Sequence, residues 1–379
     1  MTPTQPTTSE RPASRPARSE GRAGRRAERV TRSIAPQAIH TGPPRSGHRT
    51  GRRIIGLAIG VVLLGAVCAL SLFVGSASLG PGEVMSALTG TADPIIHSTV
   101  VEMRLPRALL GVLVGAALGV SGALAQALTR NPLADPGILG VNAGAGLAVA
   151  VAVAFFGITS ISGYVWFAFA GALLSFVLVY TIALRGPHGA TPVRLTLIGV
   201  ALTAVCTGIT QSLELVLPRV FDQMRFWGVG SIADRPAGTV AFVATFIVVG
   251  LVVAMLTGRA VNAIALGDDR ARALGVPIGL VRGTSALAIT VLCGAATAAA
   301  GPIAFVGLMI PHAVRLVTGP DHRWIMAYSV VAAPVLLVVA DIIGRLVAWP
   351  AELRVGIVTA FLGAPVLILL VRRAERGAM

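Results

Sequence analysis

The chain has 379 residues, of which 55% are hydrophobic and only 12% charged, and its mean hydropathy is +0.81. Soluble domains carry about a quarter charged residues, so this composition excludes an ordinary soluble protein and indicates a polytopic membrane protein. The chain has no lysine, which excludes a P-loop ATPase because that loop needs a lysine on the nucleotide phosphates. The net charge of +15 lies mostly in one terminal segment and short loops, so no nucleic-acid partner is expected.

Residues 1–53 are rich in Pro, Ser, Thr and Gly and hold twelve arginines against three glutamates. Such a segment buries too little apolar surface to offset the entropy lost on ordering. We therefore expect residues 1–53 to be a disordered cytoplasmic tail and residues 54–379 to form the membrane domain. A solvated tail and a tail that binds anionic membrane lipid are both open interpretations. A secretory signal is not indicated, because its basic region would lie directly before the apolar core.

Ten apolar runs follow the tail, and the third, seventh and eighth are short or interrupted by Gly and Pro. They span approximately 54–74, 108–129, 138–156, 164–184, 195–217, 237–257, 283–300, 303–317, 325–344 and 355–371. An even number of membrane crossings places both termini on one side. Both termini are basic, so the positive-inside rule predicts that they are cytoplasmic. The expected fold is an all-α polytopic protein of the cell membrane with about ten transmembrane helices.

The second run, Ala108 to Thr129, is uncharged and long enough to cross a hydrocarbon core of about 30 Å. Three glycines recur at every fourth position within it: Gly111, Gly115 and Gly119. This spacing predicts a face on which a neighbouring helix approaches backbone to backbone. The run ends before Asn131-Pro132, because proline cannot extend the helix.

Three arginines are predicted to lie on the outer side, against the topology signal. Arg104 and Arg107 precede the second run, and Arg345 ends the ninth. They are either anchors that extend to the membrane surface or a surface for the carboxylates of a partner, since guanidinium binds carboxylate with two hydrogen bonds. Asp341, four residues before Arg345, is expected to neutralise part of its charge along a helix.

The longest predicted cytoplasmic connection, Gly258 to Gly283, contains the sequence ALGDDRARALGVP. Asp268 and Asp269 precede a short stretch that ends at Leu274-Gly275, which is typical of a short helix. A short charged helix outside the membrane has little core of its own. We therefore expect a surface for a cytoplasmic partner, with a merely solvated loop as the alternative.

Ionisable residues inside the runs are few and lie near their ends. Glu214 and Asp341 are near predicted outer ends, and His312 is near an inner end, where a helix-end role is expected. A carrier coupled to protons or ions needs an ionisable residue near mid-membrane, so this pattern disfavours one. No disulfide or metal role is expected for the three cysteines, because they lie separately in apolar runs. A membrane enzyme with catalytic residues is not expected either, because the runs contain no cluster of His, Glu and Asp.

Eight motifs, in order from about residue 60 to 371, resemble those of the FecCD-type permeases, which belong to ATP-driven importers of iron-siderophores, haem and cobalamin. They are RLPR (104–107), SGALAQ (121–126), RNPLADPGILG (130–140), ARALGV (271–276), GPIAFVGLMIPHAVR (301–315), GPDHR (319–323), DIIGRL (341–346) and ELRVGIVTAFLGAP (352–365). The tail lies outside the resemblance. One position departs from the family pattern, which usually has proline where this chain has Arg354.

The resemblance implies the architecture of a type II ABC importer permease, with ten transmembrane helices per subunit. The implied partners are a second permease copy, identical or paralogous, two cytoplasmic ATPase subunits and an extracytoplasmic substrate-binding protein. The chain itself would be no enzyme and would need no cofactor, since the partner subunit binds ATP. The implied activity is import of a ferric siderophore by alternating access, with cobalamin, haem and, from another class, an ion-coupled secondary transporter as alternatives.

The resemblance also implies roles for three groups of residues. Arg104, Arg107 and Arg345 match arginines that dock the binding protein. Asn131 and Leu133 match one connection at the cytoplasmic gate, and Thr191 lies in the other. The residues that match the coupling segment for the ATPase include Asp268, Asp269, Arg272, Leu274 and Gly275.

Overall fold

The computed structural model describes residues 46–75, 78–185 and 191–377, so most of the segment expected to be disordered lies outside the described residues. Within those ranges the chain is helical and contains no strand. The α-helices are α2 (Ser46–Phe73), α3 (Pro81–Leu88), α4 (Pro94–His97), α5 (Leu105–Thr129), α6 (Val141–Phe156), α7 (Ile161–Leu184), α8 (Pro192–Val216), α9 (Pro218–Trp227), α10 (Ala237–Ala265), α11 (Asp268–Ala273), α12 (Ile278–Ala300), α13 (Val306–Thr318), α14 (His322–Val347) and α15 (Val355–Gly377). A π-helix, η1 (Ser98–Arg104), precedes α5, and a 3-10 helix, η2 (Pro136–Leu139), precedes α6.

Each of the ten predicted apolar runs corresponds to one helix, which confirms the all-α membrane fold. Among the described residues, seven helices are long and apolar enough to cross a membrane by length and composition, and three apolar helices are shorter. The seventh run, expected to be short, is a full helix of 23 residues, α12, while the tenth has an apolar part of only Val355–Leu369. Helix α2 begins at Ser46, before the expected start of the membrane domain at residue 54.

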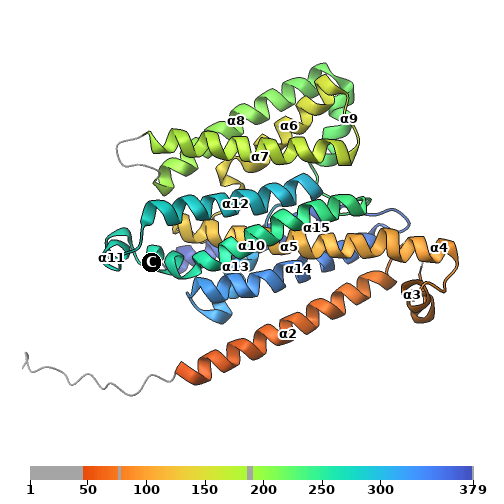
Figure 1. Ribbon diagram of the computed structural model, residues 1–379, viewed down its shortest axis with the longest axis horizontal. Helices are drawn as coiled ribbons and strands as arrows, with labels where there is room; N and C mark the ends of the chain where they lie inside the picture. Colours follow the sequence, from red (N-terminus) through yellow and green to blue (C-terminus); the bar gives the residue numbers. More distant parts are fainter. Residues whose placement is uncertain (1–45, 76–77, 186–190, 378–379) are drawn as a thin grey trace, which may run out of the picture. The chain divides into compact units, whose positions relative to one another are not determined.

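Helix α5 lies at the centre of the packing. In the span that includes α5, 83% of the most apolar window is buried, against 11% for α2. Helix α5 packs against α14, α12, α10 and α13. Within residues 50–377 the long helices run side by side, with α11 at one end and α3 and α4 at the other (Figure 1). We call these the α11 end and the α4 end.

The glycine face predicted for α5 is its contact with α14 and α13. A Cβ atom on Gly115 would lie 2.6 Å from the backbone of Pro334, and one on Gly119 would lie 2.6 Å from the Cβ of Ala333. A Cβ atom on Gly122 would overlap the carbonyl of Gly307. Only hydrogen fits at these positions, so the helices are close because the α5 residues are glycine.

Large apolar side chains are exposed on α2, α8 and α15, including Ile59, Leu197 and Phe361. Exposing such apolar surface to water costs a free energy of about 25 cal/mol per Å², whereas lipid tails solvate it. These faces therefore belong against lipid or against another membrane subunit.

Candidate functional site

At the α4 end, two carboxylates surround Arg107. Its Nε donates to both oxygens of Asp341 at 3.1 and 3.0 Å, and one Nη donates to Asp341 Oδ1 at 2.7 Å. Its other Nη donates to Glu352 at 2.6 Å. Asp341 also accepts hydrogen bonds from Arg345, four residues further along α14, which confirms the expected pairing. The Arg107 side chain is 13% exposed and Glu352 34%, so Glu352 is the accessible member of this cluster.

Arg104 and Arg345 hold the C-terminal end of α2. Arg104 donates to the carbonyls of Leu72 and Phe73 at 2.7 and 3.0 Å. Arg345 donates to the carbonyls of Ser71 and Val74 at 2.9 and 2.8 Å. The last carbonyls of a helix lack partners within it, and α2 has no basic residue in its own last turn. Both arginines are more than 90% buried because they cap a helix that precedes them in the sequence.

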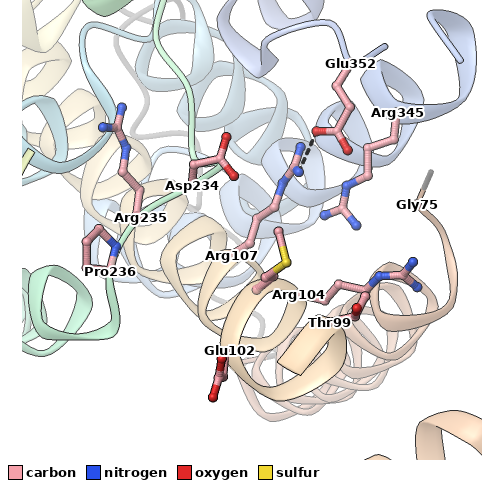
Figure 2. A pocket seen from close by; sticks show the side chains of 11 residues that line it. Gly75, Thr99, Glu102, Arg104, Arg107, Asp234, Arg235, Pro236, Arg345 and Glu352 are labelled. Atoms are coloured by element: carbon pink, nitrogen blue, oxygen red, sulfur yellow. Dashed lines mark hydrogen bonds and ion pairs between the residues drawn. The ribbon is translucent and has the colours of Figure 1, made fainter. Parts of the chain in front are cut away.

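These arginines border a cavity of about 390 Å³ at the α4 end (Figure 2). In Figure 2 Arg107 points toward Glu352, and Asp234 and Arg235 lie on the opposite side of the cavity from Arg345. The lining combines arginines with acidic residues: Arg104, Arg107, Arg235 and Arg345 with Glu102, Asp234 and Glu352. The structure therefore brings together the three arginines that the sequence analysis singled out, with their charges largely paired inside the chain.

Arg354 occupies the position where the FecCD-type pattern usually has proline. It joins the start of α15 to α9. Its guanidinium donates to the carbonyl of Phe226 and lies 4.5 Å from the centre of the Phe226 ring. Arg225 lies 4.5 Å from the same ring. The aromatic ring therefore has two cations against it, and this group borders a second cavity of about 400 Å³ beside Glu352. Partial burial and the neighbouring Arg235 lower the pKa of the Arg354 guanidinium.

At the other end of α5 the chain turns sharply. Arg130 adopts a left-handed conformation with φ of 51° and ends the helix. The side chain of Asn131 then accepts a hydrogen bond from the amide of Leu133 at 2.9 Å, and its carbonyl accepts one from Ala134 at 3.1 Å. Asparagine forms such side-chain turns readily, and Pro132 fits within one. The predicted gate residues Asn131 and Leu133 thus belong to one compact turn.

The start of α8 lies against this end of α5. Thr191 caps α8, its hydroxyl accepting from the amide of Arg194 at 3.4 Å. The next residue, Pro192, borders a small apolar cavity of about 20 Å³ together with Thr129 and Arg282. The end of α5 and the start of α8, which flank the two connections assigned to a gate, therefore lie close together in the fold, and α12 borders the same cavity.

The segment assigned to a cytoplasmic partner forms α11. Asp269 is fully exposed, and Arg272, 66% exposed, donates to it at 3.0 Å. Leu274 is 66% exposed, and Gly275 follows with φ of 74°, as expected for a glycine that ends a helix. Leu274 is thus an exposed apolar side chain beside charged residues, outside the membrane spans.

Asp268 points the other way from these residues. Its carboxylate accepts from Arg282 at 3.0 and 2.9 Å and from Arg130. Partial burial raises the pKa of Asp268, but the hydrogen bonds and charges of the two arginines outweigh this and hold the pKa below its usual value.

Sequence reasoning assigned no role to Arg130, Arg282 or Glu352, all of which take part in these clusters. The available signal was a single charge at the edge of an apolar run, which patterning alone treats as a membrane-surface anchor. Among the described residues no group of three or more His, Cys, Asp or Glu side chains is arranged to hold a metal ion.

Comparisons with known proteins agree on one family. Residues 63–373 match the model of the FecCD transport family. The chain is 48% identical to the ferric enterobactin transport system permease protein FepD of Escherichia coli, over 88% of this chain and 99% of that protein. It is 39% identical to the probable siderophore transport system permease protein YfiZ of Bacillus subtilis (83% and 94% covered). It is 35% identical to the hemin transport system permease protein HmuU of Yersinia pestis (75% and 86% covered).

A solved structure of a metal-chelate type ABC transporter in an inward-facing conformation has the same fold. It superposes with a TM-score of 0.74 and 26% sequence identity, over 84% of this chain and 98% of that one. The helical architecture described above is therefore shared with that transporter.

Proposed function

Since this chain belongs to the FecCD transport family and is a membrane permease of an ABC importer, we propose that its substrate is a ferric siderophore. The observation that carries the substrate class is the 48% identity to a ferric enterobactin permease along almost its whole length. In the proposal the chain moves the chelate inward by alternating access, both termini are cytoplasmic, and the α11 end faces the cytoplasm.

The ATPase partner binds the exposed side of α11 in this proposal. Asp269, Arg272, Leu274 and Gly275 supply that surface, and the exposed leucine supports it. In this proposal the ATPase partner binds and hydrolyses ATP, and the permease subunit contributes to transport through the position of its helices.

The binding protein docks at the α4 end in this proposal. Arg107 is the member of the arginine group that meets carboxylates of the partner, because its accessible partner Glu352 can be exchanged for one of them. Arg104 and Arg345 support this surface by holding the end of α2 in place.

The gate in this proposal is the turn at Asn131 and Leu133 together with Thr191, where the end of α5 meets the start of α8. The second permease subunit covers exposed apolar faces, for which α8 and α15 are the candidates. Co-purification with a tagged copy of this chain will identify the second subunit as an identical copy or a paralogue.

The proposal is tested by uptake in a strain lacking this chain and in the same strain complemented with it. We expect radiolabelled ferric enterobactin to enter only the complemented cells, and only when the ATPase subunit is present. Hemin is the second substrate to test, because the chain is 35% identical to a hemin permease. Entry of hemin or cobalamin but not of ferric siderophore would contradict the substrate class. Uptake that persists without the ATPase and stops when the proton gradient is removed would indicate a secondary transporter instead.

A further inference from the structure

The six-residue helix α11 has two different faces. Asp269 and Arg272 are exposed, whereas Ala271 is fully buried and the Asp268 side chain is 29% exposed. Asp268 and Asp269 are adjacent in the sequence, but a helix turns by about 100° per residue, so their side chains diverge. The Asp269 side is therefore the more accessible one to a partner of α11.

The inward face is held through the Asp268 carboxylate. Arg282 from α12 donates one Nη to both of its oxygens, at 3.0 and 2.9 Å. Arg130, which ends α5, donates to Asp268 and also to the carbonyl of Ile264 at 3.1 and 2.8 Å. One carboxylate therefore joins α11 to α12 and to the end of α5, and Arg130 extends the connection to the last turn of α10.

Arg130 links the Asp268 carboxylate to the turn that follows α5. Arg130 immediately precedes Asn131, whose side chain and carbonyl organise the turn at Leu133 and Ala134. Its own left-handed backbone sets the angle at which the chain enters that turn. A displacement of Asp268 therefore acts directly on the residue that begins the turn.

Arg282 connects the same carboxylate to the second connection of the gate. It borders the small cavity together with Thr129 at the end of α5 and Pro192 at the start of α8. Its Nε is buried without a hydrogen-bond partner, so Asp268 is the group that fixes the direction of this guanidinium.

We infer that Asp268 is a positioning residue that transmits movement of α11 to the inner gate through Arg130 and Arg282. The inference rests on the proposed function, in which an ATPase moves the exposed side of α11. Charge-assisted hydrogen bonds are strong and directional, so a carboxylate shared by two guanidiniums moves both of them with α11. Asp269 contributes to the surface that the ATPase binds. Asp268 passes the resulting movement of α11 to Arg130 and Arg282.

The test compares two neighbouring substitutions in the complete importer, with its ATPase subunits and binding protein, reconstituted in liposomes. Asp268→Asn removes the charge and keeps the shape, and Asp269→Asn makes the same change on the exposed face that binds the ATPase. The readout is ferric enterobactin imported per ATP hydrolysed. We expect Asp268→Asn to lower this ratio by about fivefold or more, within the range of known coupling effects, while the ATPase still co-purifies.

Asp268→Glu distinguishes positioning from simple loss of stability. It retains the charge and reaches both arginines, so we expect it to restore most of the ratio that Asp268→Asn loses. Asp269→Asn alters the face that binds the ATPase, so we expect it to weaken co-purification of the ATPase. An unchanged ratio in Asp268→Asn would overturn the inference. Loss of ATPase co-purification in Asp268→Asn alone would also overturn it, because Asp268 would then contact the partner itself.

A second measurement tests the link between Asp268 and the turn at Leu133 and Ala134 without a transport assay. Hydrogen exchange of the Leu133 and Ala134 amides in the purified permease should rise at least about fivefold in Asp268→Asn and stay at the wild-type rate in Asp269→Asn. Equal exchange in the two variants would contradict the connection. A wild-type complex that imports no chelate with ATP would contradict the proposed function, and the exchange measurement would still decide the role of Asp268.

Discussion

Arg107 and Asp341 are 234 positions apart in the sequence and are joined by three hydrogen bonds between their side chains. The pair fastens the first turn of α5 to the last third of α14. Arg345 shares the same carboxylate, which is 2% exposed. A buried acid between two arginines depends on both of them. Without it Arg345 would lose its carboxylate partner, and Arg107 would keep only Glu352.

Replacement of Asp341 by alanine should therefore destabilise the permease strongly. Removing one member of a buried ion pair costs about 3–5 kcal/mol, because the charge of the other stays buried. Thermal denaturation of the purified protein in detergent measures the effect. Glu352→Ala is the matched control, since Glu352 binds the same Arg107 but is one-third exposed, and its loss should cost about 0–1 kcal/mol. Equal losses in the two variants would be inconsistent with this account.

Arg107→Gln should weaken docking of the substrate-binding protein by about tenfold or more, because it removes a charge-assisted contact from the proposed interface. Asp341 keeps Arg345 as a partner in this variant, so the fold should survive. Affinity is measured by surface plasmon resonance with the loaded binding protein. Thermal denaturation of the variant verifies folding, and unchanged affinity in a folded variant would remove Arg107 from the docking surface.

Gly115→Val should disrupt the contact between α5 and α14. The first added carbon would lie 2.6 Å from the backbone of Pro334, and backbone cannot rotate away as a side chain can. Overpacking of this kind costs about 1–3 kcal/mol or more. Gly65→Ala on α2 meets no atom within 4 Å and serves as control. Expression and melting temperature of the two variants should differ clearly, and similar values would argue against the glycine face as a tight contact.

Asp268 should make the α11 end sensitive to acid. Its pKa in the folded protein is lowered, so its contribution to stability is complete above the ordinary aspartate pKa of about 3.9 and is lost as pH falls through the folded value. Wild type should therefore be more stable than Asp268→Asn at neutral pH, and the difference should shrink as pH falls below about 4. Melting temperatures across pH 7 to 3 test this, and a difference that grows in acid would have the wrong sign.

Arg354→Gln should loosen the contact of α9 with the start of α15. It removes a hydrogen bond to the Phe226 carbonyl and a cation from the face of the ring, which is worth about 0.5–1 kcal/mol at an exposed site. Hydrogen exchange in Pro218–Trp227 should rise. Arg225→Gln removes the other cation but leaves the carbonyl contact, so its effect should be smaller. Identical exchange in wild type and Arg354→Gln would show that Arg354 does not hold α9.

Hydropathy and charge alone were sufficient to locate the ten apolar helices, whereas the short helices α3, α4 and α9 were not predicted. The uncharged run before Asn131-Pro132 is α5, and its glycine spacing predicted the close contact that α14 and α13 make. These features are local, because the length of an apolar run and the volume of a side chain are properties of the sequence itself. The seventh run was grouped with those that are short or interrupted by Gly and Pro, but it forms the full helix α12, which packs against α5 and α10.

The sequence also determined which residues are charged, but not which groups they bind in the folded chain. Arg104 and Arg345 were expected to be membrane-surface anchors or a docking surface. In the structure they donate to carbonyls at the end of α2, because the unpaired carbonyls of a helix end attract cations. Asp268 and Asp269 are chemically identical neighbours. Only the tertiary structure decided that one is exposed and the other is bound by Arg130 and Arg282, since partners far along the chain come within hydrogen-bonding distance only after the helices pack.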